Sequence, residues 1–83
     1  MAEKRVAKVT HYWAKIGVAA IKLYDTLRVG DTIHVSGSTT DFEQTVDSME
    51  IEHEAVEVAK KGQEVGLKVN ERVRKGDRVY KVD

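Results

Sequence analysis

The 83-residue sequence contains no cysteine and no proline. Without cysteine there is no disulfide framework, no thiolate metal ligand and no cysteine nucleophile, so redox chemistry at the residue level is excluded. Without proline, a Ser-rich stretch or a low-complexity stretch, no segment has the composition of an interdomain linker. At this length we expect a single domain, residues 1–83, with a modest hydrophobic core.

Long apolar segments are also lacking. No run approaches the roughly 18 residues that a membrane-spanning helix needs, and the opening MAEKRVAKVT has no apolar core of the kind found in signal peptides. We therefore expect a cytoplasmic protein with no membrane partner. Asn and Gln number three together, while 34% of the chain is charged, a bias typical of proteins from hot environments.

A net charge is absent as well, because fourteen basic residues balance fourteen acidic ones. The molecule therefore lacks the overall positive field that by itself indicates nucleic-acid binding. The charges are unevenly placed: residues 41–57 carry seven acids and no Lys or Arg, whereas residues 58–83 carry eight basic and four acidic residues. Solvated strand faces are the ordinary explanation of such blocks.

Short segments rich in Val, Ile, Thr and aromatic residues predict an all-β fold. The clearest expected strands lie within residues 6–12, 16–23, 32–36 and 64–69. Ile33 and Val35 alternate with polar residues, so one face of their strand is expected to be buried. Six expected strands with turns spaced about 8 to 15 residues apart then predict a closed β-barrel.

Two segments depart from simple alternation. Between residues 41 and 53 the apolar positions change parity at Asp47–Ser48, which indicates either a β-bulge in one long strand or two short strands joined by a loop. Residues 54–61, EAVEVAKK, have the one helical pattern in the chain, and we expect a helical turn there that ends before Gly62.

One short pattern occurs three times, as RVGDTIHV at 28–35, KKGQEVGL at 60–67 and RKGDRVYK at 74–81. In each, we expect the Gly to adopt a positive φ and the following Asp or Gln side chain to hydrogen-bond backbone N–H groups of the turn. The β-branched residue two positions later then begins a strand that points into the core. Because the copies are unequally spaced, a regular solenoid is excluded.

The order of these motifs resembles the second domain of translational GTPases, most closely that of elongation factor one alpha and elongation factor Tu. The matching segments are LRVGDTIHV at 27–35, SMEIEHEAVEVAKKGQEVGLKV at 48–69 and VRKGDRVYKV at 73–82. The resemblance implies a stand-alone, six- to seven-stranded antiparallel β-barrel of the translation-protein type. No G-x-x-x-x-G-K-[ST] motif is present, so no nucleotide, cofactor or GTPase activity is expected. Similar barrels also occur as accessory C-terminal domains in collagenase-like peptidases, where they bring no catalytic residues.

In elongation factors this barrel holds the aminoacylated end of tRNA. The resemblance transfers that surface to residues 50–53 and to the turn at residues 63–66, with Glu50, Glu52, His53, Glu64 and Gly66 as the candidate contact residues. Glu50 matches a family Glu, whose carboxylate can accept a hydrogen bond from a ribose 2′-OH. Glu64 departs from the Asn that is common in the family. A carboxylate donates no hydrogen bond and adds negative charge beside a phosphate backbone.

Trp13 is the only Trp and lies at a predicted hairpin tip with Lys15 nearby. Such a residue either stacks on a base or on a partner's side chain, or covers one open end of the barrel. The three histidines lie on different predicted strands without the spacing of zinc ligands, so no metal site is expected. No nucleophile–base or paired-carboxylate pattern indicates catalysis.

The leading interpretation is a non-enzymatic, elongation factor-like binding module whose partner is tRNA, the ribosome or a translation-associated protein. The alternative is a protein-interaction or accessory domain without nucleic-acid contact, similar to the C-terminal barrel of collagenase-like peptidases. The zero net charge and the acidic segment favour the alternative. A net negative pocket around Glu50 and Glu64 would argue against any phosphate-bearing ligand.

Overall fold

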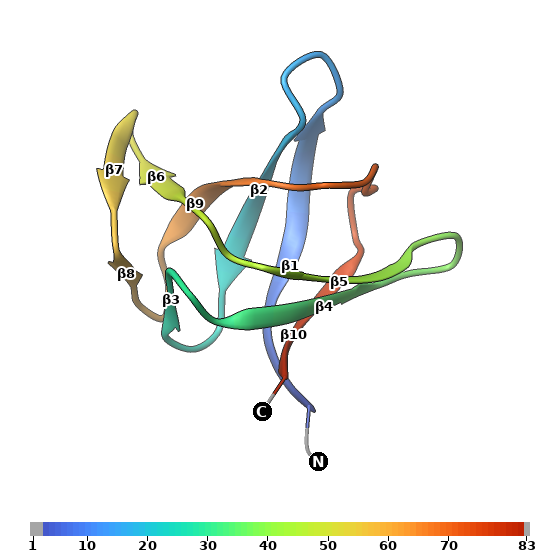
Figure 1. Ribbon diagram of the computed structural model, residues 1–83, viewed down its shortest axis with the longest axis horizontal. Coiled ribbons are helices and arrows are strands. Elements are labelled where there is room, and N and C mark those ends of the chain that lie inside the picture. Colours follow the sequence, from blue (N-terminus) through green and yellow to red (C-terminus); the bar gives the residue numbers. More distant parts are fainter. Residues whose placement is uncertain (1–2, 83) are drawn as a thin grey trace.

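The computed structural model describes residues 3–82, and all of its regular elements are strands (Figure 1). They are β1 (Glu3–Trp13), β2 (Val18–Leu23), β3 (Leu27–Arg28), β4 (Thr32–Ser36), β5 (Asp41–Thr45), β6 (Met49–Ile51), β7 (Glu54–Val56), β8 (Val58–Ala59), β9 (Glu64–Lys68) and β10 (Arg78–Val82). The all-β prediction is confirmed. Within residues 3–82 no helix is long or apolar enough to cross a membrane.

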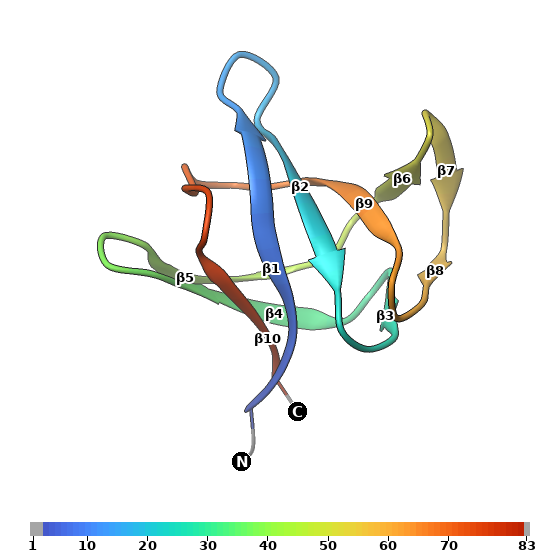
Figure 2. The same cartoon turned by 180° about the vertical axis from the view of Figure 1, so that it is seen from behind.

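Eight of the strands form one antiparallel sheet in the order β5-β4-β10-β1-β2-β9-β6-β7, and β3 pairs separately with β8. The two views show this sheet curling around a common interior, with the long β1 and β2 hairpin rising from one side (Figure 1 and Figure 2). The predicted closed barrel of six or seven strands is not what forms. The sheet is open, with β5 and β7 as its edges, because the short β7 runs directly into β8, which pairs with β3 instead.

A buried glutamine connects the β5 edge to the far side of the rolled sheet. The Gln44 side chain, on β5, is only 6% exposed. Its Nε2 donates to the Lys68 carbonyl at 2.9 Å, and its Oε1 accepts from the Asn70 backbone N–H at 2.8 Å. The Gln44 side chain therefore joins β5 to the end of β9 and the segment after it, and satisfies a backbone carbonyl and a backbone N–H there.

The core consists of the inward-facing residues of nearly every strand. In β4, Ile33 and Val35 are almost fully buried, whereas Thr32, His34 and Ser36 are only partly so, as the alternation predicts. Buried polar side chains are few, and within residues 3–82 every buried side-chain nitrogen or oxygen has a hydrogen-bond partner. This matches the general rule that a buried polar group is kept only when it is paired.

The prediction of a helical turn at residues 54–61 is wrong. This segment forms β7 and β8 followed by a turn. Val56 pairs with Met49 of β6, and Val58 pairs with Arg28 of β3. Two helical turns are marginal alone, and β-branched Val residues are favoured in strands, so pairing with distant segments decides the structure.

The parity change at Asp47–Ser48 comes from two strands and a connection, the second of the two readings, not from a bulge in one strand. β5 pairs with β4, whereas β6 pairs with β9 and β7. Residues 46–48 between them carry the chain from one part of the sheet to another, and both Val46 and Met49 remain buried.

The three repeated motifs form the expected turns. Gly30, Gly62 and Gly76 have φ values of 98°, 89° and 94°. In each turn the Asp or Gln side chain accepts the backbone N–H three residues earlier: Asp31 from Arg28 at 2.9 Å, Gln63 from Lys60 at 2.8 Å and Asp77 from Arg74 at 2.8 Å. Ile33, Val65 and Val79, two positions after these residues, are all buried. The sequence pattern and the geometry agree in all three copies.

Candidate functional site

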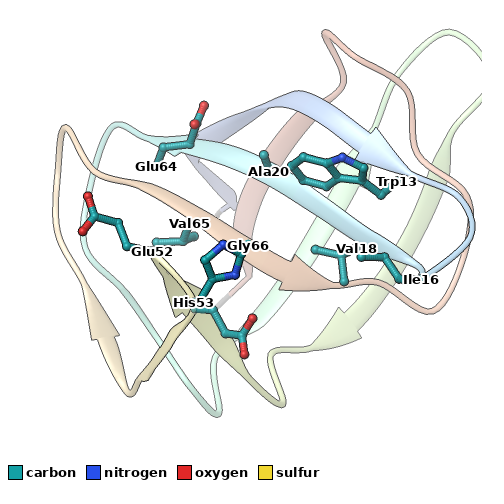
Figure 3. A pocket seen from close by; sticks show the side chains of 10 residues that line it. Trp13, Ile16, Val18, Ala20, Glu52, His53, Glu64, Val65 and Gly66 are labelled. Atoms are coloured by element: carbon teal, nitrogen blue, oxygen red, sulfur yellow. The ribbon is translucent and has the colours of Figure 1, made fainter.

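A cavity lies on the outer face of the sheet, over β2, β9 and β6, and has a volume of about 550 Å³ (Figure 3). We call it the Trp13 pocket. Its lining residues are Trp13, Ile16, Val18, Ala20, Glu50, Glu52, His53, Glu64, Val65 and Gly66. Six of the seven residues singled out from the sequence are therefore brought together, and Lys15 is the exception. It lies in the turn after β1, between lining residues Trp13 and Ile16, but does not itself line the pocket.

The floor of the pocket exists because two small residues meet on the outward face of the neighbouring strands β2 and β9. Gly66 of β9 is paired with Ala20 of β2 on one side and with Glu50 of β6 on the other. Ala20 has only a methyl group and Gly66 has no side chain, so the outer face of the sheet is hollowed at this row. A Cβ placed on Gly66 would meet Val18 Cγ1 at 3.6 Å, an ordinary contact, so the backbone does not itself demand glycine here.

Trp13 forms one wall at the end of β1. The following turn is held by the Gly17 N–H, which donates to the Trp13 carbonyl at 2.9 Å. The indole is 44% exposed, and the His11 ring lies against it with centroids 4.4 Å apart and a 60° angle between the planes. Trp13 is thus positioned by neighbours and still presents a large aromatic surface, a combination common in binding sites.

Glu52 and His53 form the opposite wall, in the two-residue turn between β6 and β7 (Figure 3). Both have positive φ, 50° and 67°, in the region that Asn-Gly normally occupies in such hairpins. For residues with a Cβ this backbone costs roughly 1–2 kcal/mol each. The chain keeps two large polar side chains in a turn where smaller residues would be more stable, and such local strain is found more often at binding sites than elsewhere.

Glu64 stands at the start of β9, on the same outward face as Gly66. The Thr10 hydroxyl donates to Glu64 Oε2 at 2.8 Å, and the Ala20 carbonyl, 3.1 Å from the same hydroxyl oxygen, is its alternative acceptor. This contact holds the carboxylate beside the pocket. Gln63, by contrast, uses its side chain to close the preceding turn.

The lining of the pocket is negative. It includes three carboxylates, Glu50, Glu52 and Glu64, and neither Lys nor Arg. Phosphate-bearing ligands are held by cationic side chains and backbone N–H groups, and uncompensated carboxylates repel them. By the criterion drawn from the sequence, this pocket argues against a nucleic-acid strand as its ligand.

Three lining residues were not anticipated: Ile16, Val18 and Ala20. Val18 and Ala20 lie on the same face of β2 by the two-residue period of a strand. In the same way, Gly66 shares a face of β9 with Glu64. The small residues Ala20 and Gly66 on outward faces were the available sequence signal for a hollow.

A second polar cluster lies outside the pocket and is structural. His34 of β4 has both Glu3 carboxylate oxygens 3.0 Å from Nδ1, and Asp41 Oδ1 2.5 Å from Nε2. The hydrogen bonds to Glu3 first, and then to Asp41, raise the pKa of His34. The carboxylates lie at opposite ring nitrogens, so they do not converge on one metal position, and no three His, Asp or Glu residues within 3–82 form a metal-binding group.

No protein-family profile matches the chain. It is 49% identical over 76 residues to an uncharacterized protease of Methanocaldococcus jannaschii, a match that covers 90% of this chain and 19% of the protease. It is also 36% identical over 80 residues to a collagenase of Porphyromonas gingivalis, covering 94% of this chain and 22% of the collagenase. The chain thus spans about a fifth of the length of these relatives.

Among solved structures, the chain resembles the C-terminal domain of a candidate U32 peptidase from Geobacillus thermoleovorans. The TM-score is 0.91 at 20% identity, and the match covers 96% of this chain and 93% of that one. At this identity the likeness concerns the fold. It shows that an independently crystallised domain has this arrangement of strands.

These comparisons overturn the resemblance to elongation factors. The relatives are a protease and collagenases, and the structural match is a peptidase domain, so the prediction of a translation factor-like module that binds tRNA or the ribosome is wrong. The Gly-containing turns that carried the resemblance are local devices for entering a strand, and unrelated small β domains share that need. The comparisons agree instead with the alternative, a domain similar to the C-terminal domain of collagenase-like peptidases.

Proposed function

We propose that this chain is a non-enzymatic accessory domain that acts with a peptidase-like catalytic region and contributes polypeptide binding to it. The observation that carries the proposal is the 49% identity to a protease over 90% of this chain but only 19% of the protease. A segment of that relative length fits an appended domain better than a whole catalytic unit.

The Trp13 pocket supports a binding role. It combines a half-exposed indole, an apolar floor and a few polar groups at the walls, which is the usual composition of a recognition site. No hydroxyl, thiol or amine nucleophile is among its ten lining residues. The chemistry of peptide-bond cleavage is accordingly assigned to the catalytic region, and recognition to this domain.

The test uses the collagenase of Porphyromonas gingivalis, in which the matching 80-residue segment is deleted or replaced by this chain. Collagen binding and cleavage of a short fluorogenic peptide are measured for the intact, deleted and replaced forms. We expect deletion to weaken collagen binding while short-peptide cleavage persists, and replacement to restore binding.

The isolated chain supplies the control, since it should cleave neither collagen nor the short peptide. Peptide cleavage by the isolated chain, at a rate lost when Glu50 and His53 are replaced, would show that the assignment of a purely accessory role is wrong. Collagen binding that is unaffected by the deletion would show that binding resides elsewhere.

A further inference from the structure

We propose that the Trp13 pocket binds the side chain of an arginine presented by a polypeptide. The inference rests on the proposed polypeptide-binding function and names the chemistry of what is bound. It is argued from the charge of the pocket, from the indole and from the shape of the floor.

The charge of the pocket selects a cation. Glu50 lies on β6, Glu52 in the β6–β7 turn and Glu64 at the start of β9, so three different elements contribute a carboxylate to the lining of the cavity. No Lys or Arg among the lining residues neutralises them. A cationic side chain entering the cavity would gain charge-assisted hydrogen bonds from several directions.

A planar cation fits this pocket best. A guanidinium has five N–H donors in a fixed plane and stacks on aromatic faces, whereas an ammonium is a compact and strongly hydrated point charge. Trp13 offers the aromatic surface at one wall, and Trp is the best of the aromatic residues for cation–π contact. Arginine therefore uses the carboxylates and the indole together, and lysine uses mainly the carboxylates.

The apolar part of the pocket suits the methylene groups of the arginine side chain and the residues next to it in the bound polypeptide. Val18 and Ala20 form apolar floor beside Gly66, and Ile16 is a large apolar side chain that is 64% exposed at the rim. Charged side chains bury their methylene groups along such surface while the head group meets polar partners. The volume of about 550 Å³ lies within the roughly 300–1,000 Å³ typical of ligand pockets.

The first experiment titrates the intact chain with the peptide acetyl-Ala-Val-Arg-Val-Ala-amide and follows Trp13 fluorescence. The same peptide with Lys or with Gln in place of Arg is the comparison. We expect saturable binding of the Arg peptide, weaker binding of the Lys peptide and about tenfold weaker binding of the Gln peptide, which has no charge. Binding should weaken as salt rises from about 50 to about 500 mM, because exposed charges are screened.

Variants locate the binding. The double variant Glu50→Gln with Glu64→Gln should lower affinity for the Arg peptide about tenfold. Gly66→Leu should abolish binding by filling the floor, and Gly66→Ala, whose Cβ has room at 3.6 Å from Val18, should weaken binding without disturbing the fold. Glu43→Gln removes an exposed carboxylate of β5 outside the pocket, and it should bind as the natural protein does.

Several results would overturn the proposal. These are equal affinity for the Arg and Gln peptides, tighter binding of inorganic phosphate than of the Arg peptide, or unchanged binding in both folded Gly66 variants. The collagenase experiment is independent of these peptide titrations. If this chain restores collagen binding but does not prefer the Arg peptide, the arginine inference fails and the proposed function stands. If it binds the Arg peptide selectively but does not restore collagen binding, the proposed function fails and the arginine site stands.

Discussion

Replacement of Gln44 by Leu tests how the open sheet is held at its β5 edge. Gln44 is 6% exposed, and its amide satisfies the Lys68 carbonyl and the Asn70 N–H at 2.9 and 2.8 Å. Leu keeps the approximate volume but leaves both backbone groups without this partner. Each part-buried group left unpaired costs about 1–3 kcal/mol, partly offset by the apolar contacts of Leu, so we expect a loss of about 2–4 kcal/mol.

The loss is measured by urea and thermal denaturation followed by circular dichroism. For a chain of this size, 1 kcal/mol corresponds to about 4–8 °C in Tm, so Gln44→Leu should melt roughly 10–25 °C below the natural protein. Glu43→Leu on the same strand is the matched control, because Glu43 is exposed and should change stability by less than about 0.5 kcal/mol. A Gln44→Leu variant no less stable than Glu43→Leu would refute the role assigned to the amide.

Three further changes test other parts of the structure. His34 has a pKa raised by Glu3 and Asp41, so its stabilising contribution is fully present below the unfolded pKa and is lost as pH rises through the higher folded pKa. His34→Gln should remove this part of the pH dependence of unfolding; equal slopes in the natural protein and His34→Gln would contradict it. Gly37→Ala should destabilise the fold by about 1–3 kcal/mol, because its Cβ would overlap the carboxylate of the buried Asp77, while Gly66→Ala is tolerated. Equal melting temperatures of these two Ala variants would count against that reasoning. Asp31→Ala removes the acceptor for the Arg28 N–H and should cost about 1 kcal/mol in urea denaturation, and no measurable change would mean that the side chain is dispensable in this turn.

The local features of the fold were predictable because their causes are local. The turns at Gly30, Gly62 and Gly76 follow from a glycine and a neighbouring side-chain acceptor a few residues apart. The burial of Ile33 and Val35 follows from strand alternation. Each of these predictions needs only the residues of a single segment.

The errors concern interactions between distant segments. The sequence of residues 54–61 predicts a helix because Ala55, Val58 and Ala59 have helical spacing. In the structure Ala55 pairs with β6, and Val58 and Ala59 pair with β3. The partners of Gln44 are 24 and 26 residues further along the chain, so no local pattern revealed how the β5 edge is held. Sheet closure depends on such contacts, and a sequence motif does not specify them.

The candidate site shows a different relation between sequence and structure. Glu50, Glu52, His53, Glu64 and Gly66 were selected through a resemblance that the comparisons contradict, yet the structure gathers them with Trp13 around one cavity. Their convergence follows from pairing across β2, β9 and β6 and from one hairpin turn. Strand pairing between distant segments thus brings these positions together, and the charges that meet there determine which ligand fits.

The most direct measurement of the central claim is a nitrogen-15 NMR titration of the intact chain with the Arg-containing peptide. The account predicts saturable shifts at the Trp13 indole and at the amides of Ala20, Glu64 and Gly66, and much smaller shifts with the Gln-containing peptide. The account would be contradicted if no shifts are seen, or if they are centred on the separate hollow that residues 36–38 and 75–78 line.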